Sequence, residues 1–341
     1  MINQVYKLVA PRRLEVSYED ISLNTDNVIV RPKYISICKA DQRYYTGTRG
    51  EEVLKKKLPM ALTHEGVGVV AYDPSGVFQK NQQVVMVPNT PYEKDDLIGA
   101  NYLPTSKFRS SASDGFMQDY ISIAHDRLVA LPDDIDMRMA SFSELISVAM
   151  HGISRFEKVA HQRRNRIAVW GNGSLGYITT LILKKKYPEA EIIIIGRTKQ
   201  KLDYFSFADE AYTSNDLPEG FSFDHAFECV GGNNSGVAVN QMIDNINPLG
   251  YIALLGVSED LVALNTRMVL EKGLTLQGST RSEREDFEAV VEFFEKYPDG
   301  VEELQRLIGQ VYKVRKIDDI INAFEKDLNQ YWGKTVMEWQ I

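Results

Sequence analysis

A glycine-rich hexapeptide, Gly171-Asn-Gly-Ser-Leu-Gly176, follows a short apolar run at 166–170 and precedes a helical pattern. In this strand–turn–helix context, G-x-G-x-x-G indicates a dinucleotide site, whereas the alternative is a glycine-rich turn without a ligand. The first glycine permits a tight turn, the second lets backbone N–H groups approach a pyrophosphate, and the third lets helix and strand pack closely. A second apolar run at 191–195 completes a β-α-β unit. We therefore predict a nucleotide site at Gly171, Gly173, Ser174, Leu175 and Gly176.

The segment after the second apolar run bears on which nucleotide binds. It reads Gly196-Arg-Thr-Lys-Gln-Lys201 and lacks the acidic residue that would contact the ribose hydroxyls of NAD. A carboxylate there repels a 2′-phosphate, whereas Arg197 and Lys199 attract one. The alternative is a solvated first helical turn with Thr198 as its N-cap. We predict NADPH as cofactor, with Arg197, Thr198 and Lys199 in its site.

Residues of metal-ligand type occur at three places in the first half of the chain. They are Cys38, the pair His64-Glu65, and Glu144. A thiolate, an imidazole and one or two carboxylates suit a four-coordinate zinc ion with an exchangeable position. Each residue alone also fits a structural role, and the separations are too long for a local metal motif. Spacing alone therefore does not establish a site.

Composition excludes several classes of protein. The chain has 341 residues, enough for two domains, with 44% hydrophobic and 25% charged residues. A net charge of −8 argues against a broad nucleic-acid or anionic-membrane surface. No apolar run approaches a membrane span, and the N-terminus shows no export signal. With Cys38 and Cys229 as its only cysteines, the chain has no disulfide framework, and we expect a cytoplasmic protein.

The pattern of elements changes near residue 147. Residues 1–147 contain short β-type runs broken by glycine and proline, including 27–32, 66–71, 83–87 and 117–121, and predict a barrel-like β domain. Residues 148–282 alternate strands with helices, as in a doubly wound parallel sheet. Residues 283–341 contain an amphipathic helix at 286–294 and a β-like tail at 334–339, which we expect to complete the first domain. The six strands expected in the sheet are 166–170, 191–195, 210–213, 225–230, 250–257 and 274–279.

The order of these motifs resembles the zinc-dependent medium-chain dehydrogenase/reductase family. Cys38-x-x-Asp41, His64-Glu65-Gly66, Phe142-x-Glu144 and the glycine turn occur in the family's order. The resemblance implies a GroES-like catalytic domain and a Rossmann domain with the active site in the cleft between them. Glu144 in place of a cysteine resembles the polyol dehydrogenase branch. The implied zinc ligands are Cys38, His64, and Glu65 or Glu144 or both, with water; Cys229, in Phe227–Gly231, is assigned to the cofactor site.

Two departures from the family pattern limit what can be carried over. The four-cysteine lobe that binds a structural zinc is absent, so one zinc per chain is expected. Ala40 replaces the hydroxyl residue usually found two positions after the first ligand. A proton relay must then use another group, such as water through Glu65 or Tyr44.

Further segments resemble the bacterial ribulose-5-phosphate reductases over the full length. They are Asp41–Gly47, Val87–Thr90, Arg109–Ser111, Asp114–Asp119, Phe223–Gly232 and Trp332–Val336. The resemblance implies NADPH-dependent reduction of D-ribulose 5-phosphate to D-ribitol 5-phosphate, for the CDP-ribitol of teichoic acids or capsules. It suggests a homodimer through the edge of the Rossmann sheet and a ribitol-5-phosphate cytidylyltransferase as a possible partner.

A phosphorylated sugar requires basic residues in the site. The candidates by position are Arg43, Arg109, Arg281 and Arg284, each of which also fits an ordinary surface arginine. Two other functions stay open at this point. One is oxidoreduction of an unphosphorylated polyol or a 3-hydroxy amino acid, and the other is a metal-free nucleotide-binding or structural protein.

Overall fold

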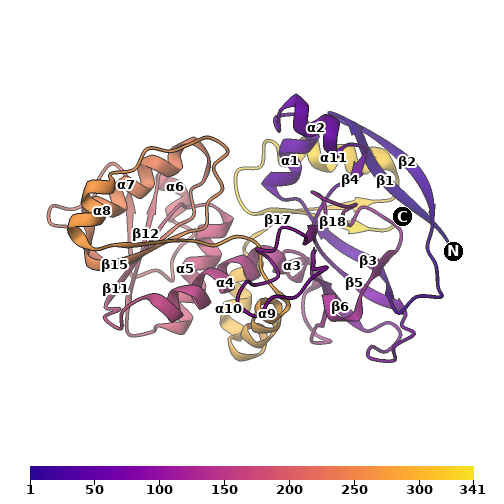
Figure 1. Cartoon of the computed structure of the whole chain (residues 1–341), viewed down its shortest axis with the longest axis horizontal. Helices are drawn as coiled ribbons and strands as arrows, with labels where there is room; N and C mark the ends of the chain where they lie inside the picture. The colour runs from indigo at the N-terminus through magenta and orange to yellow at the C-terminus, as the bar shows by residue number, and fades with distance from the viewer. The chain divides into compact units, whose positions relative to one another are not determined.

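The computed structural model describes all 341 residues and consists of two compact units (Figure 1). The first, here the β unit, contains residues 1–147, 282–296 and 304–341. The second, the α/β unit, contains residues 148–281 and 297–303. No helix has both the length and the apolar character that crossing a membrane requires.

Two sheets and a small ladder form the β unit. The larger sheet has the order β10-β6-β5-β3-β18-β17, with β9 also paired to β3; the smaller has the order β2-β1-β4, and β7 pairs with β8. The strands are β1 (Ile2–Ala10), β2 (Arg13–Asp20), β3 (Val28–Ser36), β4 (Met60–Ala61), β5 (Glu65–Tyr72), β6 (Gln83–Met86), β7 (Asn89–Thr90), β8 (Lys107–Phe108), β9 (Ile121–Ile123), β10 (Leu128–Ala130), β17 (Ile308–Val314) and β18 (Lys334–Trp339).

The C-terminal strand β18 lies inside the larger sheet. It pairs antiparallel with β3, Val336 opposite Ser36, and parallel with β17. Residues 334–337 are buried because this strand has neighbours on both sides. The helices of the unit are α1 (Lys39–Thr46), α2 (Glu51–Lys57), η1 (His125–Arg127), α3 (Met137–Ala140), α9 (Arg284–Lys296) and α11 (Ile317–Asp327), while α4 (Ser143–Val159) and α10 (Pro298–Gln305) continue across the unit boundaries.

The α/β unit is a six-stranded parallel sheet in the order β13-β12-β11-β14-β15-β16, which confirms the doubly wound fold. In β12, Ile192–Ile195 are all buried, as expected for a parallel strand covered on both faces. The strands are β11 (Arg166–Trp170), β12 (Glu191–Gly196), β13 (Glu210–Thr213), β14 (Phe223–Glu228), β15 (Ile246–Leu254) and β16 (Thr275–Gly278). The helices are α5 (Ser174–Lys186), α6 (Lys199–Leu202), η2 (Gly232–Asn234), α7 (Ser235–Asn245) and α8 (Thr266–Lys272).

One predicted strand is wrong. The run 117–121 is irregular except for an isolated bridge between Gln118 and Val5, and the strand begins only at Ile121. The cause is local, because the Gln118 side chain donates to the backbone oxygen of Gly115 and accepts from Asn3. These side-chain bonds replace the ladder that the apolar pattern suggested.

Candidate functional site

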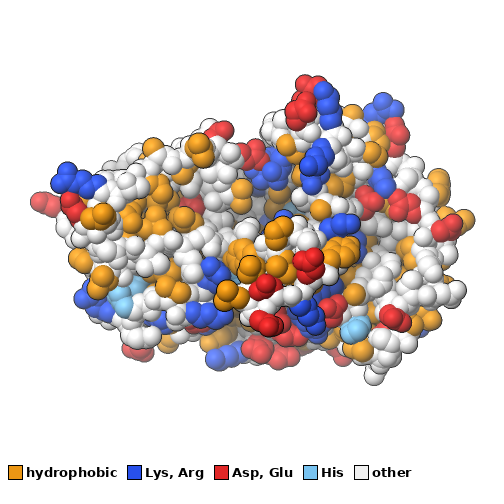
Figure 2. Space-filling model, in the orientation of Figure 1, with side chains coloured by type: hydrophobic (Ala, Val, Ile, Leu, Met, Phe, Trp, Pro, Cys, Tyr) orange, Lys and Arg blue, Asp and Glu red, His pale blue; other side chains and the backbone are white.

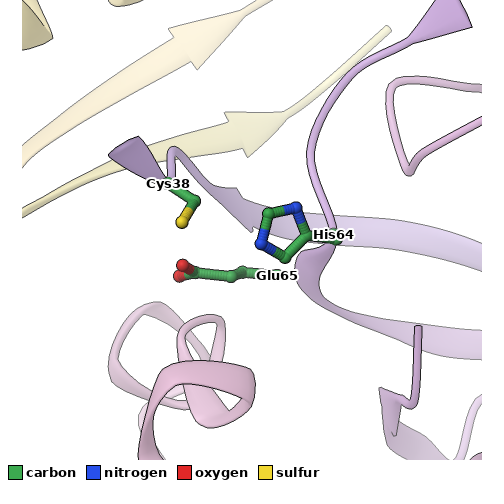
Figure 3. Close-up of side chains that lie close together, drawn as sticks. All are labelled: Cys38, His64 and Glu65. Atoms are coloured by element: carbon green, nitrogen blue, oxygen red, sulfur yellow. The ribbon is translucent and has the colours of Figure 1, made fainter. Parts of the chain in front are cut away.

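Three potential metal ligands meet in the β unit. The ligand atoms of Cys38, His64 and Glu65 all lie within 4.8 Å of one another. In Figure 3 the thiol, one ring nitrogen and the carboxylate face a common centre. Cys38 is the N-cap of α1, just after β3, while His64 and Glu65 lie at the start of the adjacent strand β5. The pairing of β3 with β5 therefore joins ligands that are distant in sequence.

Asp41 orients this cluster from the first turn of α1. Its carboxylate accepts hydrogen bonds from the Cys38 backbone N–H at 3.1 Å and the Ser110 hydroxyl at 2.5 Å. Its Oδ1 also lies 3.5 Å from Nδ1 of His64. A carboxylate at one imidazole nitrogen fixes the ring and leaves the other nitrogen for a metal. This role of Asp41 was not predicted from the sequence, although the capping-box spacing Cys38-x-x-Asp41 was a usable signal.

The neighbours of His64 and Asp41 shift the pKa values of both side chains. Burial opposes a charged His64, but Asp41 and Cys38 outweigh it and raise the pKa of the imidazole well above its ordinary value. The pKa of Asp41 is lowered, since His64 and Ser110 overcome the effect of burial. A metal ion binds the neutral imidazole, so zinc competes with a proton for His64.

We expect Asp41→Asn to weaken zinc binding about 10- to 100-fold, because the amide cannot hold the imidazole as the carboxylate does. The measurement is the zinc dissociation constant, obtained by competition with a chromogenic chelator. Ser110→Ala removes one hydrogen bond to the same carboxylate and should weaken zinc binding less than Asp41→Asn does. An Asp41→Asn protein with the zinc affinity of the parent would contradict this role.

Glu65 is held by two groups from neighbouring strands. Its Oε1 lies 2.8 Å from the ammonium of Lys334 on β18, and its Oε2 accepts a bond from the Ser36 hydroxyl on β3. Lys334 is itself buried and also donates to the Ile37 carbonyl at 2.8 Å. Burial alone would lower the pKa of Lys334, but Glu65 and Cys38 raise it above its ordinary value. Neither Lys334 nor Ser36 was predicted from the sequence to contact Glu65.

Glu144 approaches the same cluster from α4. Its Oε2 lies 4.0 Å from Nε2 of His64, and the side chain is buried. Burial raises the pKa of this carboxyl to about 7, against the opposing effect of His64. The set of one thiol, one imidazole and two carboxyls has the donor chemistry of a zinc site.

The glycine turn has the geometry expected of a nucleotide site. Gly171 has φ 117°, and a Cβ there would lie 2.6 Å from the Cys229 carbonyl oxygen. A Cβ on Gly176 would lie 1.6 Å from the oxygen of Gly171, so only glycine fits. A Cβ on Gly173 would meet no atom within 4 Å, which leaves open space before the N-terminus of α5, where Ser174 and Leu175 begin the helix. This arrangement suits an incoming phosphate.

Asn172, which the sequence analysis did not single out, connects this turn to the loop after β12. Its buried amide donates to the Thr198 carbonyl at 2.7 Å. Arg197 and Lys199 flank that carbonyl and are exposed, so their charges are available at the surface. Cys229 lies against the turn at the end of β14, and burial raises its thiol pKa. It therefore lies beside the glycine turn, and its assignment to the cofactor site stays a prediction.

Tyr44, one of the two predicted relay residues, lies in the core of the β unit. Its side chain is 3% exposed and belongs to the hydrophobic core of the β unit, with the Arg49 guanidinium 4.9 Å from its ring centre. Glu65, the other predicted relay residue, accepts hydrogen bonds at both oxygens, from Ser36 and Lys334.

All four arginine candidates have partners within the protein, and those of Arg109 and Arg284 can be named. Arg109 donates to the carbonyls of Asp114 and Ser122, and burial lowers its pKa to about 10. Arg284 pairs with Glu288 at 2.7 Å and donates to the Leu128 carbonyl. Both therefore have donors engaged within the protein, and their assignment to the substrate phosphate stays a prediction. Arg43 lies in the last turn of α1, and Arg281, with φ 56°, follows β16.

Comparison with known proteins places the chain in a family. Residues 24–133 match the alcohol dehydrogenase GroES-like domain, and residues 137–338 match the glucose dehydrogenase C-terminus. The chain is 58% identical to "Ribulose-5-phosphate reductase 1" of Staphylococcus aureus over 99% of each chain. It is 56% identical to "Ribulose-5-phosphate reductase" of Bacillus spizizenii over the whole of both chains.

A solved structure agrees with the sequence matches. The structure of S. aureus TarJ in complex with NADPH superimposes with a TM-score of 0.91 at 53% identity, covering all of both chains. The GroES-like domain, the six-stranded parallel sheet and the full-length identity therefore lead to one conclusion. The chain belongs to the medium-chain dehydrogenase/reductase family and, within it, to the ribulose-5-phosphate reductases.

Proposed function

We propose that this protein reduces D-ribulose 5-phosphate to D-ribitol 5-phosphate with NADPH, using one zinc ion per chain. The observation that carries the proposal is the buried cluster of Cys38, His64 and Glu65 in a chain at least 55% identical to three proteins named as ribulose-5-phosphate reductases. The reaction consumes one NADPH and one proton per ketose. Its product is the sugar phosphate required to make CDP-ribitol for teichoic acid or a capsule.

Cys38, His64 and Glu144 are the proposed protein ligands of the zinc. Glu65 is the poorer choice because its two oxygens already contact Lys334 and Ser36. The Glu144 carboxyl instead faces Nε2 of His64 with a raised pKa, as expected of a group that awaits a cation. When bound, zinc supplies a Lewis acid that polarises the ketone carbonyl, and NADPH supplies the hydride.

The residues around these ligands set the charge and geometry of the site. Asp41 holds the imidazole of His64 and the start of α1. Lys334 compensates the Glu65 carboxylate, so that a substrate oxygen with developing negative charge meets a site that is not strongly anionic. For the cofactor, the glycine turn binds the diphosphate of NADPH and Arg197 binds its 2′-phosphate.

Substrate phosphate is assigned to the arginine candidates, and Arg43 in the last turn of α1 and Arg281 after β16 are the first two to replace with alanine. A guanidinium binds phosphate with two parallel, charge-assisted hydrogen bonds, so one arginine gives much affinity for a small substrate. NADPH and a sugar phosphate are metabolites of the cytoplasm, where we place the enzyme. A cytidylyltransferase that consumes the product is a candidate partner.

A homodimer is proposed through the free edge of β16, the last strand in the sheet order. Exposed apolar residues of this unit include Leu249, Val257, Leu261 and Leu270, and the face drawn in Figure 2 carries grouped apolar side chains. Unpaired strand edges and exposed apolar groups together favour association.

Arg197→Ala is expected to weaken NADPH binding by roughly 10- to 100-fold, because a charge-assisted contact contributes about 1.5–3 kcal/mol. The NADH dissociation constant should hardly change, since NADH lacks the 2′-phosphate. Fluorescence titration of both cofactors on parent and variant measures this. If the parent already prefers NADH, the assignment of Arg197 is wrong.

The proposed function is tested by metal and product analysis. The purified chain should contain one zinc, lose turnover on chelation and recover it when zinc is restored. Mass spectrometry and enzymatic assay should identify D-ribitol 5-phosphate as the product. Turnover that persists in the zinc-free protein would contradict the proposal, as would a chain that binds NADPH without turnover.

A further inference from the structure

Asn89 has a buried side chain with no hydrogen-bond partner. The residue is 0% exposed, yet neither its Oδ1 nor its Nδ2 has a partner in the structure. Buried amides are nearly always hydrogen-bonded, and leaving one unsatisfied costs free energy. An amide with both polar atoms unsatisfied is therefore a position where an arriving polar group would be well bound.

The β7–β8 ladder places Asn89 on the side of the metal cluster. Asn89 lies directly opposite Phe108, and residues paired in this way project to the same face of the ladder. The Phe108 ring packs against the His64 ring at a centroid distance of 5.2 Å. Ser110, two residues further along, donates to Asp41 at 2.5 Å.

The side chains on the opposite face of the ladder line a pocket at the protein surface. Thr90 and Lys107, the next pair in register, line an open pocket together with Arg109. The alternation of side chains therefore separates Asn89 and Phe108 from this pocket. The unpartnered amide is thus a neighbour of the candidate active site and not part of the outer surface.

We propose that Asn89 binds a hydroxyl group of the substrate, on a carbon next to the carbonyl that is reduced. A hydroxyl both donates and accepts, which matches the NH₂ and carbonyl oxygen of the amide. The neutral amide adds no charge to a site already rich in carboxylates, and it discriminates a polyhydroxylated ketone from a simple one. This inference rests on the proposed function, because it assigns a part of that substrate to a residue.

The first test is the variant Asn89→Leu, which keeps the size of the side chain and removes both polar atoms. We expect kcat/KM for D-ribulose 5-phosphate to fall about 10- to 100-fold, since a buried substrate hydroxyl loses its partner. Zinc content and the NADPH dissociation constant should stay at the parental values. Tm should be equal or higher, because the variant removes an unsatisfied polar group from the free protein. Thr90→Val, on the opposite face of the ladder, is the matched control and should leave kcat/KM unchanged.

The second test pairs the variant with substrate analogues that lack the 1-hydroxyl or the 3-hydroxyl. If Asn89 binds the hydroxyl that one analogue lacks, the parent protein should have a kcat/KM on that analogue about as low as that of Asn89→Leu on D-ribulose 5-phosphate. On the same analogue, kcat/KM of Asn89→Leu should lie within about threefold of the parental value. An equal cost on all three substrates would overturn the inference, as would an unchanged kcat/KM with a lowered Tm, which indicates a purely structural amide. If the parent itself does not reduce D-ribulose 5-phosphate, the proposed function fails, a result distinct from either outcome.

Discussion

Replacing Cys38 with serine is expected to remove the bound zinc and lower kcat on the order of 1,000-fold or more. Thiolate supplies charge and softness that a hydroxyl lacks, so the two remaining protein ligands, His64 and Glu144, hold zinc weakly. Loss of a Lewis acid that contributes several kcal/mol to the transition state corresponds to a rate loss of this size. Metal content by atomic emission and turnover with NADPH are measured on the same preparation.

Two matched variants sharpen this test. Cys229→Ser changes the other cysteine, a buried thiol beside Thr179. This variant should retain the zinc content of the parent protein. Glu144→Gln should lose more zinc than Glu65→Gln, because Lys334 and Ser36 already hold Glu65. A Cys38→Ser protein with full zinc and full activity would show that the metal is bound elsewhere.

Lys334→Met is expected to destabilise the zinc-free protein by about 3–5 kcal/mol, the range for removing one partner of a buried ion pair. The ammonium lies 2.8 Å from Glu65, and both side chains are buried. Without it, the Glu65 carboxylate keeps only the Ser36 hydroxyl. Chemical denaturation of the zinc-free variant, followed by circular dichroism, gives the free energy of unfolding.

The double variant Lys334→Met/Glu65→Gln separates the lost charge pair from lost packing. It should recover most of the stability, since no uncompensated charge is then buried. If the free energy of unfolding of Lys334→Met lies within about 1 kcal/mol of the parental value, the ion pair contributes little to stability, in contrast to the usual cost of an unpaired buried charge.

Local patterns predicted the α/β unit well. The glycine turn and the six strands were recognisable because glycine spacing and apolar runs act over a few residues, and a parallel strand such as β12 is apolar throughout. The strand predicted at 117–121 is absent where the Gln118 side chain donates a hydrogen bond to the Gly115 carbonyl, because a pattern of apolar residues does not reveal such side-chain hydrogen bonds.

The metal cluster could be recognised in part only. The residue types at Cys38, His64, Glu65 and Glu144 were visible. The meeting of the first three depends on the pairing of β3 with β5, and Glu144 reaches them from α4. Lys334 lies 269 residues after its partner Glu65, and β18 brings them together. Asn89 has an unremarkable place in the sequence, because its lack of a partner is a property of three-dimensional packing.

The arginine candidates show the same limit. Position in the chain suggested phosphate ligands, but the structure gives Arg109 two backbone carbonyls and Arg284 a carboxylate. A guanidinium satisfies its donors with whatever the fold places nearby, and sequence alone does not reveal those partners.

The central claim is that the substrate is a phosphorylated ketopentose reduced by NADPH. It is tested most directly by initial rates of NADPH oxidation with D-ribulose 5-phosphate and with D-ribulose, at fixed zinc content. We predict a much higher kcat/KM for the phosphorylated substrate, because binding energy from the phosphate helps to orient the carbonyl. Equal kcat/KM for the two substrates would contradict the account and identify an oxidoreductase of plain polyols.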